Sequence, residues 1–223
     1  MDSMKGSAMA LAIVGLVLGG VIGYTVGASD DDSETTQTTQ QSPVSDEASD
    51  LRLALNTELK QHVTQAAVAL RSIAINGADS ETTAAAVSEL DNNSVAIAGL
   101  VGSVYPEQEE AFLSLWREHI GFFVSYTQGV LDGDEDVQQQ TLDDLAGYGE
   151  QATAFFTETA GLDLPPETVK SLLVGHRDLV VAAVDSLAAG DIEGYFANEA
   201  AAYDQMGEIA DALAGAIAEQ QNL

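Results

Sequence analysis

The sequence predicts an all-α protein, in which an N-terminal transmembrane helix is followed by a bundle of about six helices. Three observations support this fold class. Beyond Leu51, apolar residues recur at steps of three and four, and no alternating strand pattern of useful length occurs. Between residues 7 and 28 the chain carries no charged side chain. His62, His119 and His176 follow one another at a spacing of 57 residues, which indicates three repeats of one helical hairpin.

Residues 7–28 form the predicted membrane anchor. The stretch is long enough to cross about 30 Å of hydrocarbon as a helix. Lys5 precedes it and Asp30 follows it, so the positive-inside rule leaves residues 1–6 in the cytoplasm and places the remaining chain outside. We therefore expect a single-pass protein of the cell membrane with an extracellular or periplasmic C-terminal domain. A secretory signal peptide is the alternative, because Val26-Gly27-Ala28 resembles a cleavage site.

Two further features belong to this N-terminal part. Four glycines lie on one side of the predicted helix, namely Gly15, Gly19, Gly23 and Gly27. This spacing lets a second helix approach closely and predicts a homo-oligomer, although Gly is also common in single transmembrane helices. Residues 29–50 contain almost no large apolar side chain. We expect them to form a flexible stalk, because they cannot offset the entropy of ordering.

The charge balance excludes several classes of function. Thirty-six acidic residues against seven Lys and Arg give a formal net charge of −29. Such a negative field repels nucleic acid, which is therefore excluded as a partner. The lack of Cys in the sequence excludes disulfides, thiol catalysis and Cys-ligated metals. The composition is typical of halophilic proteins, whose self-repulsion is screened by concentrated salt, and an ordinary acidic extracellular protein is the alternative.

Residues 51–223 form the predicted bundle, which turn signals divide into six helical segments. These signals are Asn76-Gly77, Tyr105-Pro106, Asp132-Gly133, Gly161 to Pro166 and Gly190-Asp191. Each histidine is followed by about fourteen helical residues and then by a Gly with a nearby Asp. Each unit is therefore expected to consist of a helix, a tight turn and a returning helix.

Each histidine interrupts an apolar stripe that is expected to face the core. In the first unit this stripe consists of Leu55, Leu59, His62, Ala66, Ala69 and Ile73. If the helices alternate up and down, the three histidines lie at one height. Counting equal distances past each turn places Asn93 opposite His62, Tyr148 opposite His119 and Tyr203 opposite His176. The sequence thus predicts a buried polar layer of His, Asn and Tyr across an otherwise apolar bundle.

This polar layer is open to three interpretations. His62, His119 and His176 could bind Zn or Cu, with Asn93, Tyr148, Tyr203 or Met206 near an open position. Alternatively, each histidine could hydrogen-bond the Asn or Tyr of its own hairpin and fix the helical register. An organic ligand between the helices is the third interpretation, because bundles often build pockets in their core. No HExxH or Glu-x-x-His motif supports the metal site.

Several segments resemble a family of secreted bacterial helical domains. They are Leu90-Asp-Asn-Asn-Ser-Val, Gly102-Ser-Val-Tyr105 and Phe112 to Thr127. Members of this family are sometimes attached to copper-amine-oxidase-like N-terminal modules, and the resemblance extends over most of Leu51 to Ile217. In the family a His precedes the returning Tyr and Met residues, whereas Gly147 precedes Tyr148 here and Gln205 precedes Met206. This departure weakens the metal site, and the attached module's name implies no oxidase activity for this chain.

The sequence favours a binding module over an enzyme. It contains no serine nucleophile elbow, phosphate-binding glycine loop, EF-hand or dinucleotide fingerprint. The expected function is that of a membrane-tethered extracytoplasmic bundle, which binds a metal ion, a small ligand or a protein partner in the cell envelope. The alternative is a purely structural or adhesive envelope protein without a ligand site.

Overall fold

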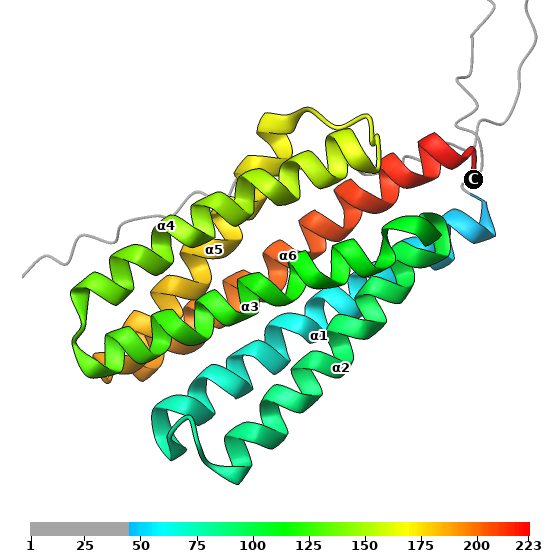
Figure 1. Cartoon of the computed structure of the whole chain (residues 1–223). Coiled ribbons are helices and arrows are strands. Elements are labelled where there is room, and N and C mark those ends of the chain that lie inside the picture. Colours follow the sequence, from blue (N-terminus) through cyan, green and yellow to red (C-terminus); the bar gives the residue numbers. More distant parts are fainter. Residues whose placement is uncertain (1–44) are drawn as a thin grey trace, which may run out of the picture. The chain divides into compact units, whose positions relative to one another are not determined.

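The described part of the chain is built from helices. The computed structural model describes Ser45–Leu223, and the predicted anchor at 7–28, its four glycines and the stalk up to residue 44 lie outside these residues (Figure 1). Within Ser45–Leu223 there are six α-helices and no strand, which confirms the all-α prediction for this part. None of these helices has both the length and the apolar character that a membrane span requires.

Short connections join the helices. The six are α1 (Asp46–Asn76), α2 (Glu81–Val104), α3 (Glu109–Asp132), α4 (Glu135–Ala154), α5 (Pro166–Ala188) and α6 (Ile192–Gln221). A 3₁₀ turn, η1 (Pro106–Gln108), precedes α3. A π-helical turn, η2 (Phe155–Thr159), extends the end of α4.

The first helix begins earlier than predicted. The sequence places the boundary between stalk and bundle at Leu51, but α1 already starts at Asp46. The Ser45 side chain accepts a hydrogen bond from the backbone N–H of Ala48, and Asp46 and Glu47 lie in the first turn. A capping hydroxyl and acidic side chains both stabilise a helix N-terminus. The boundary at Leu51 is therefore wrong, because these polar residues start the helix before its apolar stripe begins.

The three predicted hairpins are confirmed. Each turns at a glycine with positive φ, which is +85° at Gly77, +68° at Gly133 and +74° at Gly190. Other residues are strained at such angles, so the turns depend on glycine. A side-chain oxygen then caps each returning helix by accepting a backbone N–H. The capping residues are Ser80 for α2, Asp134 for α4 and Asp191 for α6.

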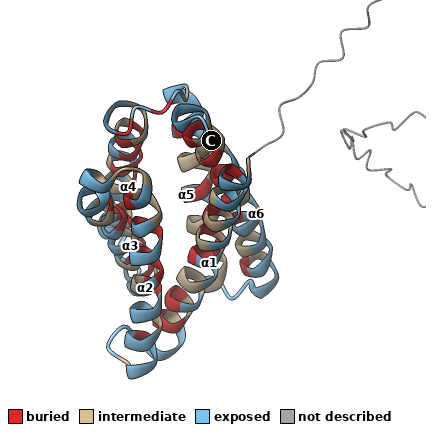
Figure 2. Cartoon of the chain, turned by 90° about the vertical axis from the view of Figure 1, so that its right-hand side faces the viewer, coloured by how far each residue is buried: buried red, intermediate tan, exposed pale blue. Residues whose placement is uncertain are grey.

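The six helices form a closed ring with the odd-numbered helices turned inward. Around the ring the order is α1, α2, α3, α4, α5 and α6, and α6 packs back against α1. In addition, α1, α3 and α5 contact one another. Buried residues lie on the helix faces turned toward the interior and exposed residues lie outside (Figure 2). The seam between α4 and α5 has the least extensive contact of the ring.

The apolar core falls into two clusters along the bundle. The larger includes Phe112 and Trp116 of α3 together with Phe155 of η2 and many residues of α1 and α6. The smaller includes Phe123 and Tyr126, further along α3. His119 lies between these two sets of α3 residues, so the polar layer falls at the junction of the clusters.

Stability should rise with salt concentration. The chain carries a net charge of −29, and the described residues form only four ion pairs between side chains, all at least partly exposed. Between 0.05 M and 2 M NaCl the Debye length falls below about 3 Å, so the self-repulsion of the acidic surface is screened. We expect Tm to increase by roughly 5 °C or more, which thermal unfolding followed by circular dichroism would measure. KCl should give the same increase at equal ionic strength, and an unchanged Tm would contradict salt adaptation.

Candidate functional site

The inward-facing helices bring the three histidines together. His62 of α1, His119 of α3 and His176 of α5 are all buried, and all three line one small chamber of about 40 Å³. The ring centroids of His62 and His119 lie 5.4 Å apart. The equal spacing in the sequence therefore corresponds to a common height in the bundle.

Aromatic side chains surround this chamber. The Trp116 ring packs edge-on against both imidazoles, with centroids 4.9 Å from His62 and 4.7 Å from His119. Tyr148 of α4 stacks on His119 at 4.8 Å, with an angle of 25° between the rings. The prediction that Tyr148 lies opposite His119 is confirmed, although the two rings stack and form no hydrogen bond.

Asn93 also lies where the sequence places it. It is buried, and its Nδ2 donates to the backbone oxygen of Glu58 at 3.0 Å and to Glu58 Oε2 at 2.9 Å. These bonds tie α2 to α1 next to His62. Within the described chain, Asn93 Oδ1, Trp116 Nε1 and the Nδ1 atoms of the three histidines are buried without a hydrogen-bond partner. The polar layer thus retains unused hydrogen-bonding capacity.

Burial keeps the histidines neutral. Desolvation and, to a lesser extent, the nearby His176 lower the pKa of His62 to about 3, while Asn93 acts in the opposite direction. Burial likewise lowers the pKa of His176 to about 4. Burial and the two neighbouring imidazoles hold the pKa of His119 well below its usual range. At pH 7 the chamber therefore contains three uncharged imidazoles.

The histidines do not form a ready metal site. Between Ser45 and Leu223, no group of three or more His, Asp or Glu side chains is arranged to hold a metal ion. The three imidazoles share one chamber, but their arrangement gives no support to a coordination set. The Zn or Cu site at His62, His119 and His176 stays a prediction.

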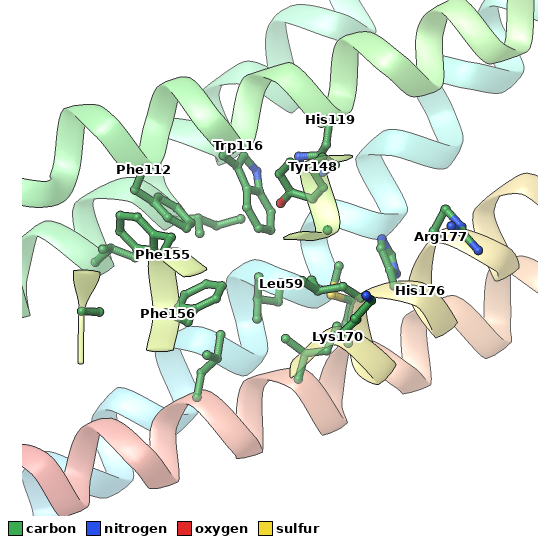
Figure 3. A pocket seen from close by; sticks show the side chains of 18 of the residues that line it. Leu59, Phe112, Trp116, His119, Tyr148, Phe155, Phe156, Lys170, His176 and Arg177 are labelled. Atoms are coloured by element: carbon green, nitrogen blue, oxygen red, sulfur yellow. The ribbon is translucent and has the colours of Figure 1, made fainter. Parts of the chain in front are cut away.

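A larger cavity opens beside the polar layer. Its volume is about 190 Å³, and residues of all six helices and of η2 line it. At one end lie aromatic rings, and at the other lie the polar side chains of α5 (Figure 3). The aromatic end is formed by Phe112, Trp116, Phe155 and Phe156. The polar end is formed by His176, Lys170 and Arg177, with His119 and Tyr148 facing them from α3 and α4.

The π-helical turn η2 shapes the aromatic end. Both Phe155 and Phe156 line the cavity, although they are consecutive. Phe155 lies 5.4 Å from Phe112, ring centroid to centroid, and Phe156 lies 6.2 Å from it. A π-helical turn interrupts the regular α-helical path, and such turns often occur at functional sites. This irregularity allows two large neighbouring rings to contribute to one wall.

Met206 and Tyr203 of α6, both predicted near the polar layer, lie in different environments. Met206 is buried and lines the cavity, as the predicted layer requires. Tyr203 is 41% exposed, and its ring packs under the Lys60 ammonium at 5.0 Å. Its assignment to the polar layer is therefore wrong. The core face of α6 runs through Ala202 and Met206, and one residue along a helix turns the side chain by about 100°.

Gln205 occupies the place that was expected for Tyr203. It lies beside His176 and acts to raise the pKa of that imidazole. Its Nε2 donates to the backbone oxygen of Leu172 at 2.6 Å, which joins α6 to α5. The sequence feature that points to Gln205 is its position immediately before Met206, on the side of α6 that faces α5.

Comparison of the chain with family models, with curated proteins and with solved structures finds no match. The functional argument therefore rests on the geometry of the cavity and its lining.

Proposed function

We propose that the bundle binds a small apolar ligand in the cavity between its aromatic and polar ends. The observation that carries this proposal is the cavity itself, an apolar space of about 190 Å³ lined by many residues of the larger core cluster. Natural cores leave few voids larger than a water molecule, because unfilled space forfeits packing energy. A cavity of this size is consistent with a binding function.

The volume limits the size of the ligand. An apolar cavity of about 150 Å³ in another protein is known to bind benzene. The cavity described here is slightly larger, which suits a ligand on the order of ten non-hydrogen atoms. Phe112, Phe155 and Phe156 supply a wall that excludes water and favours an alkyl chain or a ring.

The polar layer supports the same proposal. Buried nitrogens without a partner cost about 1–3 kcal/mol each. The unpartnered Nδ1 atoms of His119 and His176 belong to side chains that line the cavity. A ligand with one polar atom near these side chains would recover part of that cost. The polar layer is therefore better suited to orienting a ligand than to stabilising the empty bundle.

The proposed placement of the cavity relative to the membrane rests on the predicted anchor. If residues 7–28 anchor the chain and the stalk follows, the cavity lies outside the cytoplasm and takes up ligands from that side. We propose a binding module and no enzymatic activity. The alternative function is a structural or adhesive envelope protein, which requires no saturable ligand.

The single tryptophan of the chain provides a direct test. Trp116 lines the cavity, so any occupant should change its fluorescence. We expect 1-octanol, an uncharged probe with an apolar chain, to change the emission saturably with a Kd below about 1 mM. Leu173→Phe adds volume at the cavity wall and should weaken this binding at least tenfold.

Leu179→Phe is the matched control for this test. Leu179 lies on the same helix and is also half-buried, but it does not line the cavity, so binding should stay within twofold of that of the unaltered chain. If 1-octanol produces no saturable change up to its solubility limit, the proposed function is wrong and the structural alternative is preferred.

A further inference from the structure

The charged residues around the cavity differ in their balance of sign from those of the rest of the protein. The whole chain has seven Lys and Arg against thirty-six acidic residues. Among the residues that line the cavity, however, two are basic and one is acidic: Lys170, Arg177 and Glu150. Because Arg177 is also paired with the neighbouring Asp178, the charges at the cavity are balanced, whereas the protein as a whole is strongly negative. A negative surface does not need this arrangement for solubility, which points to a role in binding.

These charges mark the entrance of the cavity. Lys170 and Arg177 are seven residues apart and therefore lie on the same face of α5, about two turns from each other, and Glu150 lies on α4. The contact between α4 and α5 is the least extensive in the ring, and Ala146 and Gly149 contribute little side-chain volume on the α4 side. Lys170 is exposed and Arg177 is partly buried, so side chains that line the cavity reach solvent at this seam.

Both cations have hydrogen-bonding capacity to spare. Lys170 Nζ lies 3.8 Å from Glu150 Oε1, which is a loose and exposed ion pair across the seam. Arg177 binds the neighbouring Asp178 through Nε and Nη2, at 2.9 Å and 2.7 Å. A guanidinium has five N–H donors, so these two bonds leave donors for a further acceptor. A second carboxylate can therefore join Arg177 and replace Glu150 at Lys170.

We infer that the ligand is a small anionic amphiphile, a monocarboxylate whose carboxylate lies at the α4–α5 seam between Lys170 and Arg177 and whose apolar part extends toward Phe112 and Phe156. This inference rests on the proposed function and specifies its ligand class. Figure 3 shows the two basic side chains at one end of the cavity and the phenylalanine rings at the other. Carboxylates form strong charge-assisted hydrogen bonds with Lys and Arg, and apolar walls favour the attached chain.

Three probes with the same chain length test the inference on the full chain. They are octanoate, 1-octanol and octylammonium, each titrated below its aggregation limit while Trp116 fluorescence is followed. Measurement in about 1 M NaCl screens the distant acidic surface but leaves direct contacts in place, because the Debye length is about 3 Å. We expect octanoate to bind about tenfold more tightly than 1-octanol, and octylammonium to bind most weakly, although the protein carries a charge of −29.

Substitutions at the seam assign the effect to individual side chains. Lys170→Met and Arg177→Met should each weaken octanoate binding about three- to tenfold and leave 1-octanol binding unchanged. Glu150→Gln removes the competing carboxylate and should strengthen octanoate binding. Arg52→Met is the matched control, because Arg52 forms an exposed ion pair with Asp211 and does not line the cavity. It should change octanoate binding less than twofold.

The outcomes separate this inference from the proposed function. If 1-octanol binds but octanoate binds no more tightly, the cavity is a site for neutral ligands and the inference is overturned alone. If octylammonium binds most tightly, the acidic surface dominates and the inference is also overturned. If none of the three probes binds, the proposed function fails as well. A preference for octanoate that Lys170→Met and Arg177→Met reduce, and that Arg52→Met does not, supports both.

Discussion

Lowering the pH from 7 to 4 should destabilise the bundle by several kcal/mol, enough to unfold it within this range. An ordinary histidine has a pKa near 6.5, so the unfolded chain takes up three protons below that pH. In the folded chain, burial lowers the pKa of His62 to about 3 and that of His176 to about 4, and the pKa of His119 is also well below its usual range. Between pH 6.5 and about 4, the unfolded chain therefore binds more protons than the folded chain.

The sign of the effect follows from this difference. Above pH 6.5 the histidines are neutral in both the folded and the unfolded chain, so they do not lower the free energy of unfolding. As the pH falls, each histidine costs about 1.4 kcal/mol of folding free energy per pH unit until the folded state takes up the proton. Three histidines together lose about 4 kcal/mol per unit, which is large beside a typical stability of about 5–15 kcal/mol.

Urea unfolding followed by circular dichroism at pH 7, 6, 5 and 4 measures this slope. About 1 M NaCl keeps the acidic surface screened, so that neutralisation of carboxylates at low pH does not mask the loss. His119→Phe retains a ring for stacking on Tyr148 and should reduce the slope by about one third. Glu118→Gln, at the exposed residue before His119, is the control and should leave the slope unchanged. A slope that is equal in His119→Phe and in the unaltered chain would show that the histidines are not the cause.

The sequence predicts the hairpins well because each depends on local signals. Gly77, Gly133 and Gly190 are required by positive φ, and a capping Ser or Asp follows each of them within a few residues. The equal spacing of the histidines then follows from three hairpins of similar length. Since the odd-numbered helices pack against one another, this spacing also places the three imidazoles at one height.

The rotation of α6 could not be predicted in the same way. Tyr195 and Phe196 are consecutive aromatic residues, and either could have faced the core. In the structure Tyr195 is buried and its hydroxyl donates to the backbone oxygen of Ala67 at 3.2 Å, whereas Phe196 is 51% exposed. Packing against α1 settles this choice, and the same rotation turns Tyr203 outward. The core-facing residues around Met206 are mostly alanines, and such small side chains predict the rotation of the helix only weakly.

The cavity and its entrance are properties of the packed bundle. Phe155 and Phe156 share one wall only because η2 departs from α-helical geometry, and neither residue shows this in the sequence. In the sequence, Lys170 and Arg177 resemble ordinary surface cations on a helix. Their role depends on the sparse contact between α4 and α5, which is determined by long-range packing. Site residues that act through such a seam require the structure for their identification.

Truncation of Phe112 to Ala should destabilise the protein by about 3–5 kcal/mol. Phe112 is almost fully buried, and its ring lies 5.4 Å from both Trp116 and Phe155, centroid to centroid. Removal of a buried Phe ring costs its transfer free energy and leaves a cavity that relaxes only in part. Here the new space joins the existing cavity of about 190 Å³, so collapse of the surrounding side chains is restricted. Urea unfolding at pH 7 measures the loss.

The same substitution separates a binding cavity from an incidental gap in the packing. If the cavity accepts ligands, Phe112→Ala should extend it at the aromatic end and increase the affinity for decanoate relative to octanoate, and saturating decanoate should restore part of the lost stability. Phe196→Ala removes an equal ring from an exposed position of α6 and should change stability by less than about 0.5 kcal/mol, with no change in ligand preference. Destabilisation of Phe112→Ala without any change in chain-length preference would mean that the aromatic end serves packing alone, because a wall that contacts the ligand must affect which ligand fits.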